Sequence, residues 1–114
     1  MPDAQRAITQ QTIDGVVGTI VDHFHPRRII LFGSRARGDH RPDSDLDLFI
    51  EMDIDPVVPP RERARRIRAA FSPYPCAMDL IVYTPDESAY WREAAASLPA
   101  TAYREGRILY ERAG

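Results

Sequence analysis

The chain has 114 residues, of which 44% are hydrophobic and 28% are charged, with a formal net charge of −2. A chain of this length can bury one core but not two, so we expect a single domain over residues 1–114. The composition is typical of a soluble globular protein, and the negative charge argues against binding nucleic acid by bulk electrostatics. No apolar run approaches the roughly 18 residues of a membrane span, so a cytoplasmic location is expected.

The basic and thiol-bearing residues exclude several kinds of chemistry. All 15 basic residues are arginine. Without lysine the chain cannot carry a P-loop, whose lysine contacts the β- and γ-phosphates, or form a Schiff base. Cys76 is the single cysteine, which excludes an intrachain disulfide and a zinc cluster built from thiolates.

The first half of the chain predicts a helix, a strand, a turn and a second strand. Apolar residues recur at helical spacing over residues 4–24, and this helix should stop near His25-Pro26, because proline disfavours helical geometry in the residue before it. Residues 28–32 are typical of a buried strand, and Gly33-Ser34 follows it directly. Residues 35–42 predict a short helical turn and a loop, and residues 45–51 predict a second strand.

The second half predicts three more helices and two strands. Prolines 56, 59 and 60 lead into a helix over about 60–71, and a third strand covers residues 77–83. Thr84-Pro85-Asp86-Glu87 is a capping box with proline at the first helical position. A further short helix ends at Glu105 with Gly106 as its C-cap, and residues 107–110 form a small strand. This order indicates an α/β or α+β fold, with a small mixed sheet flanked by helices.

Three aspartates lie on the predicted strands in a pattern that suits magnesium. Asp45 and Asp47 are two residues apart in one strand, so both carboxylates point to the same face, with Cα atoms roughly 6.6 Å apart. Leu46, Leu48 and Ile50 then point into the core. Asp79 lies in the third strand, where an aspartate among apolar residues is costly unless a partner neutralises it. Two Mg²⁺ ions held by these oxygens would provide that neutralisation.

Gly33 and Ser34 are suited to holding a phosphate. Glycine allows close approach of the backbone, and the N–H groups of the turn together with the Ser34 hydroxyl can donate to phosphate oxygens. Arg35 and Arg37 lie just beyond and can neutralise further phosphate charge. A triphosphate held beside the metals allows in-line attack at its α-phosphorus, and Asp79 is in position to assist deprotonation of the acceptor hydroxyl.

These residues form a recognisable signature. Phe32-Gly33-Ser34-Arg35-Ala36-Arg37-Gly38, with ten residues from Ser34 to Asp45, and then Ser44-Asp45-Leu46-Asp47-Leu48, resembles the G-S-x10-D-x-D signature of the DNA-polymerase-β-like nucleotidyltransferase superfamily. Within it the chain is similar to the minimal nucleotidyltransferase (MNT) family, from Ile29 to Glu111. The resemblance implies the polymerase-β-like nucleotidyltransferase fold, with Asp45, Asp47 and Asp79 as metal ligands and Gly33 and Ser34 on the triphosphate.

The resemblance also implies a partner. MNT proteins are commonly paired with a HEPN-domain toxin, which they silence as antitoxins by adenylylating it. The chain is therefore expected to transfer AMP from ATP to a hydroxyl, tyrosine being the favoured acceptor, on such a toxin. The metal and triphosphate site would occupy this small core, so the acceptor surface is expected on another chain of a homo- or hetero-oligomer. Two alternatives remain open: an RNA or small-molecule acceptor, and an antitoxin that acts by binding alone.

Two further groups of residues have ordinary interpretations. Arg61, Arg63, Arg65, Arg66 and Arg68 make a basic helix face, for which a solvated surface is favoured over a site for RNA or an acidic partner. Tyr90 and Trp91 are expected in the core or at an interface, in preference to a platform for stacking bases.

Overall fold

The structure is a computed structural model, and it describes residues 8–113. Helices and strands alternate along these residues in the order that the sequence predicts. Their bounds are α1 (Gln10–Phe24), β1 (Arg28–Phe32), α2 (Ser34–Arg37), β2 (Leu46–Glu51), α3 (Pro60–Arg68), β3 (Met78–Tyr83), α4 (Pro85–Trp91), α5 (Leu98–Glu105) and β4 (Arg107–Glu111). Within residues 8–113, no helix combines the length and the apolar character needed to cross a membrane.

The four strands form one mixed sheet in the order β3-β2-β1-β4. β1 is antiparallel to both β2 and β4, whereas β2 and β3 run parallel and are connected through α3. The prediction of a small mixed sheet flanked by helices is therefore confirmed. The strands that carry the signature residues, β1, β2 and β3, are neighbours in the sheet, which brings their functional side chains to one region.

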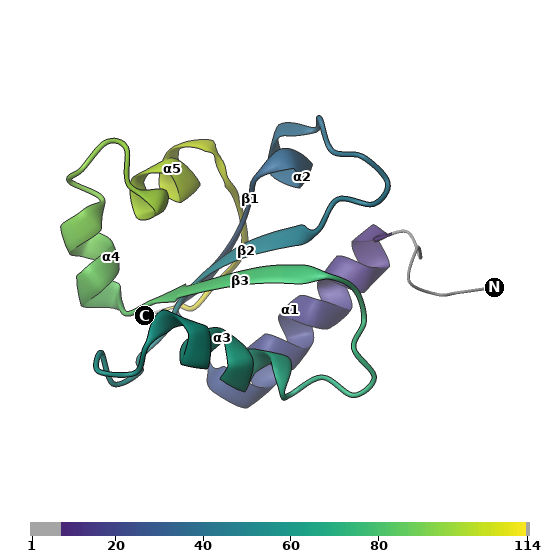
Figure 1. The fold of residues 1–114 in the computed structure, drawn as a ribbon, viewed down its shortest axis with the longest axis horizontal. Helices are drawn as coiled ribbons and strands as arrows, with labels where there is room; N and C mark the ends of the chain where they lie inside the picture. The colour runs from purple at the N-terminus through teal and green to yellow at the C-terminus, as the bar shows by residue number, and fades with distance from the viewer. Residues whose placement is uncertain (1–7, 114) are drawn as a thin grey trace.

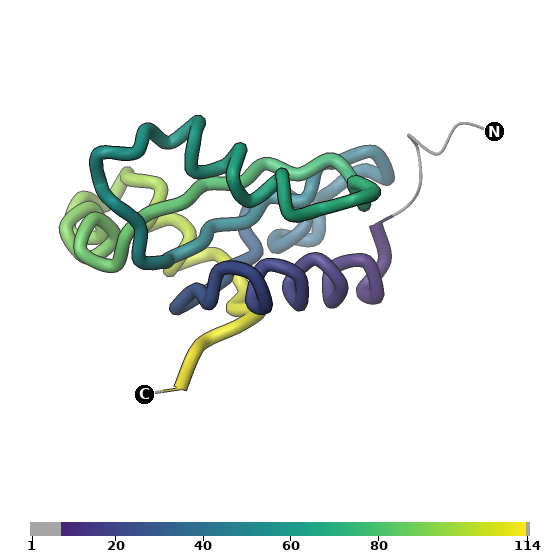
Figure 2. The backbone as a smooth tube through the Cα atoms, turned by 90° about the horizontal axis from the view of Figure 1, so that it is seen from below, coloured from purple at the N-terminus to yellow at the C-terminus, as the bar shows by residue number. Residues whose placement is uncertain are grey.

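Helices cover the sheet on both faces (Figure 1). α1 and α3 lie on the same side of it, which Figure 2 shows from below. The large core forms against these two helices, and alternate residues of β2 point into it, as predicted: Leu46, Leu48 and Ile50 are fully buried. The opposite face has a smaller core around Phe49 and Ala102, where α5 packs. α2 lies at the other end of the sheet from α5 (Figure 1), and its Ala36 packs against the large core.

The first helix begins later than the sequence predicts. Residues 4–7 of the predicted helix lie outside the described residues, and α1 starts immediately after Thr9. Thr9 Oγ1 accepts a hydrogen bond from the Thr12 N–H at 3.1 Å, and Thr12 Oγ1 accepts one from the Thr9 N–H at 3.3 Å. This reciprocal cap satisfies donors that a helix start leaves open. The helix ends at Phe24, as predicted, and His25 adopts the left-handed conformation with φ 49°.

α3 ends earlier than the sequence predicts, and α5 ends where predicted but with an extended backbone at its C-cap. α3 stops at Arg68, earlier than the predicted end at 71, because the following N–H groups donate to carbonyls three residues back and tighten the turn. Gly106 is the C-cap of α5, as predicted, but its backbone is extended, with φ −82° and ψ 173°. A Cβ at Gly106 would lie 2.4 Å from both Ala102 O and Ile30 Cγ2, so glycine is needed for close packing.

The basic helix α3 does not present a uniformly solvated face. Arg63 is only 4% exposed, and both oxygens of Glu87 accept from its guanidinium, at 2.7 and 3.0 Å. Its remaining donors bind main-chain carbonyls of Pro56, Val58 and Val82. The predicted solvated face is therefore wrong at Arg63, which ties α3 to α4 and β3. It is confirmed at Arg65 and Arg66, which are exposed and pair with Glu62.

A buried carboxylate fixes α4 and α5 to the sheet. Glu51, at the end of β2, is 2% exposed and accepts a hydrogen bond from Arg28 Nη1 at 3.0 Å. The hydroxyls of Ser88 and Tyr103 also donate to it, from α4 and α5 respectively. Because a buried carboxylate without partners would be strongly unfavourable, these bonds hold both helices in one position.

Candidate active site

Two carboxylates of the signature, Asp47 and Asp79, lie side by side on neighbouring strands of the sheet. β2 and β3 are parallel with Asp47 directly opposite Asp79, so their Cα atoms are about 4.8 Å apart, the usual spacing of neighbouring strands. Asp45 lies one residue before β2 and is exposed. Met78 and Leu80 are buried in the large core, so Asp79 points the other way, as the alternation predicts. The three aspartates therefore come from adjacent strands of one sheet.

Gly33 fits directly against Asp47. A Cβ at Gly33 would lie 2.3 Å from Asp47 Oδ2, closer than real Cβ atoms approach, and 3.0 Å from its Cγ, so the Asp47 side chain would have to move. The backbone of Gly33 also has φ 75° and ψ −157°, a region that is essentially restricted to glycine. The position thus needs glycine both for its conformation and for the space that the Asp47 carboxylate occupies.

The carboxylates repel one another, and the effect falls on Asp47. Burial raises the pKa of Asp47 first of all, and the negative charges of Asp79 and Asp45 raise it further. Arg35 and Arg37 act in the opposite direction and lower the pKa of Asp47. A cation between these carboxylates would relieve the repulsion, because it favours their ionised forms.

The burial of the aspartates differs from the sequence-based argument. The sequence predicts an unfavourable apolar environment for Asp79. In the structure Asp79 is exposed, and Asp47 is the half-buried aspartate. Among residues 8–113, no three His, Cys, Asp or Glu side chains are grouped closely enough to hold a metal ion as they stand. Asp45 and Asp79 are exposed on the open face, so their side chains have room to rotate toward Asp47.

Gly33 and Ser34 form the tight connection from β1 into α2. The Gly33 carbonyl accepts from the N–H groups of Ala36 and Arg37, both at 3.1 Å. The N–H groups of Ser34 and Arg35 precede these donors in the first turn, so the helix itself leaves them without an acceptor. Ser34 is half-buried beside the aspartates' strand, which leaves a short row of donors next to the carboxylates.

The two arginines of α2 have partners within the loop that follows. Arg35 donates through Nη2 and Nε to the Ser44 carbonyl, at 2.9 and 3.2 Å, and so fixes the loop that leads into Asp45. Arg37 pairs with Asp39 at 3.2 Å on the exposed side of α2. Their predicted contact with the triphosphate stays a prediction, but both are close enough to influence the charge of Asp47.

Ser44 belongs to the site although the sequence argument gave it no role. Its hydroxyl accepts from the Arg41 N–H at 2.9 Å, and its carbonyl receives Arg35. Together these bonds shape the approach of the chain to Asp45. The signal in the sequence is a serine at the end of a polar turn containing proline, a position where hydroxyls bond to nearby backbone.

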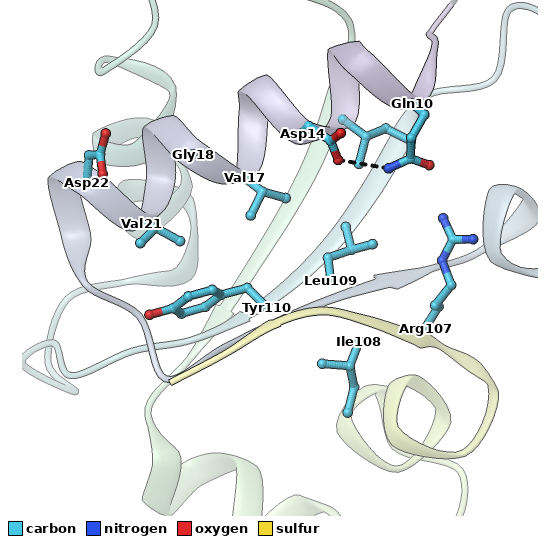
Figure 3. A pocket seen from close by; sticks show the side chains of 11 residues that line it. Gln10, Asp14, Val17, Gly18, Val21, Asp22, Arg107, Ile108, Leu109 and Tyr110 are labelled. Carbon is cyan, nitrogen blue, oxygen red and sulfur yellow. Dashed lines mark hydrogen bonds between the residues drawn. The ribbon is translucent and has the colours of Figure 1, made fainter. Parts of the chain in front are cut away.

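Among the hollows that the described residues form, two lie beside the sheet edges, and one of these two reaches Asp79. The groove of about 530 Å³ in Figure 3 lies between α1 and β4, and Val17, Val21, Leu109 and Tyr110 line it. None of the signature residues lines this groove. A second groove, of about 740 Å³, runs along β3 between α3 and α4, and Asp79 is among its lining residues.

Comparisons with known proteins identify the family and the fold. The family model described as "Nucleotidyltransferase domain" matches residues 13–103. A protein of Methanocaldococcus jannaschii, named a putative protein adenylyltransferase, is 55% identical over 29 residues, which span 25% of this chain and 29% of that protein. The chain thus matches less than a third of the length of this curated relative.

Two solved structures share the fold. The first, described as a putative nucleotidyltransferase from Sulfolobus solfataricus, has a TM-score of 0.63 at 18% identity and covers 90% of this chain and 79% of its own. The second, described as a toxin–antitoxin with AMP-PNP, has a TM-score of 0.56 at 19% identity, with coverages of 87% and 73%. The fold and the family model lead to one conclusion. The chain belongs to the nucleotidyltransferase domain family, and its fold is that of a nucleotidyltransferase.

Proposed function

We propose that this chain is a minimal nucleotidyltransferase that transfers AMP from ATP to a tyrosine hydroxyl of a HEPN-domain toxin and thereby acts as its antitoxin. The observation that carries the proposal is that Asp47 lies directly opposite Asp79, with Gly33 packed against the Asp47 carboxylate and Asp45 two residues before it. Two of the three similar proteins described above support it by their names, one as a putative protein adenylyltransferase and one as a toxin–antitoxin. Because ATP is the proposed donor, we assign the reaction to the cytoplasm.

The triphosphate would lie across the start of α2. Its oxygens would accept hydrogen bonds from the Ser34 hydroxyl and from the N–H groups of the first turn. Gly33 has no side chain to keep the phosphates away. Arg35 and Arg37 would add positive charge on the side opposite to the carboxylates, although Arg35 would also keep its bonds to the loop.

Asp45, Asp47 and Asp79 fit a magnesium centre by their chemistry. They supply only carboxylate oxygens, which Mg²⁺ prefers, and the pKa of Asp47 is raised by burial and, after that, by the negative charges of Asp79 and Asp45, which a cation would balance. When bound, two Mg²⁺ ions would neutralise charge on the triphosphate and on the attacking and leaving oxygens. The aspartates would need to rotate toward one another for this, which the exposure of Asp45 and Asp79 allows.

The residues of the chain would then position a single displacement. The acceptor oxygen forms a bond to the α-phosphorus, the bond from that phosphorus to the bridging oxygen breaks, and pyrophosphate leaves. Asp79 takes the proton of the acceptor hydroxyl, for which its exposed position is suited. Orientation of the two reactants supplies a large part of the rate enhancement.

The test uses the protein encoded beside this chain as the candidate toxin. The two proteins are purified together, and ATP labelled at its α-phosphate is added with Mg²⁺. We expect label on the toxin, none after addition of EDTA, and none with an Asp45→Ala and Asp47→Ala double variant. Absence of label with the wild-type pair would contradict the proposal. Retained neutralisation of toxicity by the double variant would mean that binding alone suffices.

A further inference from the structure

The groove along β3 leads from Asp79 to an exposed apolar surface. Its floor is the outer edge of β3, its first wall is α3 with the loop before it, and its second wall is α4. Asp79 lies at one end, and the strand then runs to Tyr83, which places the two ends on the order of 13 Å apart. Trp91, at the end of α4, lines the far part of the groove and is 46% exposed.

The walls of this groove are held in fixed positions. Arg63 joins α3 to Glu87 of α4 and to the carbonyl of Val82 on the floor. The buried carboxylate of Glu51 holds α4 to the sheet from its other side, through Ser88. The groove is therefore a formed feature of the fold, because closing it would break buried charged hydrogen bonds.

An added β-strand does not fit this edge, although β3 is the last strand of the sheet. The carbonyls of Ala77 and Tyr83 accept from β2, so Met78, Leu80 and Val82 direct their main-chain groups outward. Arg68 already donates to the Met78 carbonyl and Arg63 to that of Val82. A ligand must therefore bind through its side chains, since α3 blocks continuous strand pairing.

The charge inside the groove favours an acidic ligand. Arg63 and Glu87 neutralise each other, whereas Arg61 is exposed and pairs with no carboxylate among residues 8–113. Arg68 adds a second positive charge near Asp79. The apolar part consists of Trp91, Leu98 and Val57, and Val57 is 84% exposed. An acidic group for Arg61 and an apolar side chain for Trp91 complement this surface.

An RNA ligand fits these arginines poorly. Arg65 and Arg66 are engaged with Glu62 and do not line the groove, and Arg63 is buried in its ion pair. Only Arg61 remains fully available for a phosphate, whereas a nucleic-acid backbone is usually held by several cations at once. The apolar residues of the groove are likewise suited to a protein.

We propose that this groove binds the segment of the acceptor protein that carries the modified hydroxyl, with an acidic side chain on Arg61 and an apolar one against Trp91. This inference rests on the function proposed above, because the hydroxyl is delivered at the Asp79 end. In the step it serves, the hydroxyl oxygen bonds to the α-phosphorus, pyrophosphate leaves, and the hydroxyl proton passes to Asp79. Arg61 and Trp91 would thus determine which hydroxyl is modified, without taking part in the bond changes.

The test is a panel of synthetic peptides at millimolar concentration, each with one tyrosine. They carry either glutamate or lysine, and either leucine or glycine, at varied distances from the tyrosine. Labelled ATP and Mg²⁺ are added with wild-type protein, Arg61→Glu or Trp91→Ala. Arg65→Glu and Tyr90→Ala are matched controls, because these exposed neighbours do not line the groove. A short single-stranded RNA serves as an alternative acceptor, and binding of a fluorescent ATP analogue is measured in parallel.

We expect wild-type protein to favour the glutamate and leucine peptides. Arg61→Glu should lower kcat/KM for glutamate peptides about tenfold and shift the preference toward lysine, and Trp91→Ala should remove the preference for leucine. Nucleotide affinity and both controls should match wild type. A wild type that labels peptides regardless of charge, a preference that survives Arg61→Glu, or label on RNA alone would each overturn the inference. Absence of label on every peptide, while the co-purified toxin is labelled, would also overturn the inference, whereas absence of label on the toxin as well would overturn the proposed function on which it rests.

Discussion

The Cα of Gly33 lies directly against the side chain of Asp47. We expect this contact to be the point of the site that is most sensitive to substitution. Gly33 has a backbone conformation that costs other residues about 1–3 kcal/mol, and its missing side chain leaves the space for Asp47 Oδ2. The local backbone conformation and the proposed function would thus depend on the same residue. Gly38, five residues on, also has a positive φ of 85°, but an added Cβ there would meet nothing within 4 Å.

These two glycines give a matched pair of substitutions. Gly33→Ala should lower the rate of AMP transfer by roughly 100-fold or more, because the new methyl group would push the Asp47 carboxylate out of its position in the proposed site. Gly38→Ala should cost about 1–2 kcal/mol of backbone strain and leave the rate largely unchanged. Urea unfolding and label transfer measure the two effects separately. Equal losses of activity in both variants would contradict the role assigned to Gly33.

The raised pKa of Asp47 predicts how the stability of metal-free protein changes with pH. Because the folded state binds this proton more tightly than the unfolded state, Asp47 contributes stability below its ordinary pKa of 3.8, and this is lost as pH rises through the folded pKa. In EDTA, Asp47→Asn should therefore become more stable than wild type as the pH rises from 4 to 7. Urea midpoints of both proteins across this range test the sign. If the stability of wild type increased relative to that of Asp47→Asn as the pH rises, the prediction would be wrong.

At the scale of the elements, Arg63 is the main connection between α3, β3 and α4. All of its donors are used, by Glu87 and by carbonyls of the loop and of β3. Arg63→Ala should cost about 3 kcal/mol of unfolding free energy, because it leaves Glu87 and these carbonyls without their partner. Arg65→Ala, on the exposed side of the same helix, should have no measurable effect. Chemical unfolding of the two variants distinguishes them, and similar midpoints would contradict the assignment.

The order and type of the elements could be predicted from the sequence because local patterns determine them. The alternation of Asp47 with Leu46 and Leu48 fixes which face is buried, and Thr84 with Glu87 fixes the start of α4, where both capping hydrogen bonds are present. The environment of Arg63 could not be predicted in this way. Its partner Glu87 is 24 residues away, and five arginines on one helix give no sign of which one faces the sheet.

The candidate site was predictable to a similar extent. The spacing of Gly33, Asp45 and Asp47 identifies the strands that carry the site, and their adjacency in the sheet follows from the mixed topology. The register that places Asp47 opposite Asp79 depends on the tertiary structure. The sequence therefore predicts that Asp79 is the aspartate affected by burial, whereas in the structure it is Asp47. The brace from Arg35 to Ser44 depends on the folded loop for the same reason.

For the whole molecule, the proposed site lies between elements that are far apart in the chain, so its ligands should stabilise the fold globally. Its carboxylates lie on or next to β2 and β3, and the turn proposed to bind phosphate follows β1, so unfolding of the sheet would destroy the site. A ligand that binds only the folded protein at 100 times its Kd adds about 2.7 kcal/mol to stability. In a chain of this size, that corresponds to a rise in Tm of roughly 10 °C.

This coupling can be measured without an acceptor. We expect Mg²⁺ with a non-hydrolysable ATP analogue to raise the Tm of wild-type protein by this amount, and the analogue with EDTA to raise it much less. The Asp45→Ala and Asp47→Ala double variant should show no shift with Mg²⁺, because its remaining carboxylate cannot hold the ions. Trp91→Ala should shift like wild type, since the groove along β3 is assigned to the acceptor and not to the nucleotide. A full rise in Tm in the double variant would mean that nucleotide binding does not depend on these carboxylates, and this would contradict the proposed site.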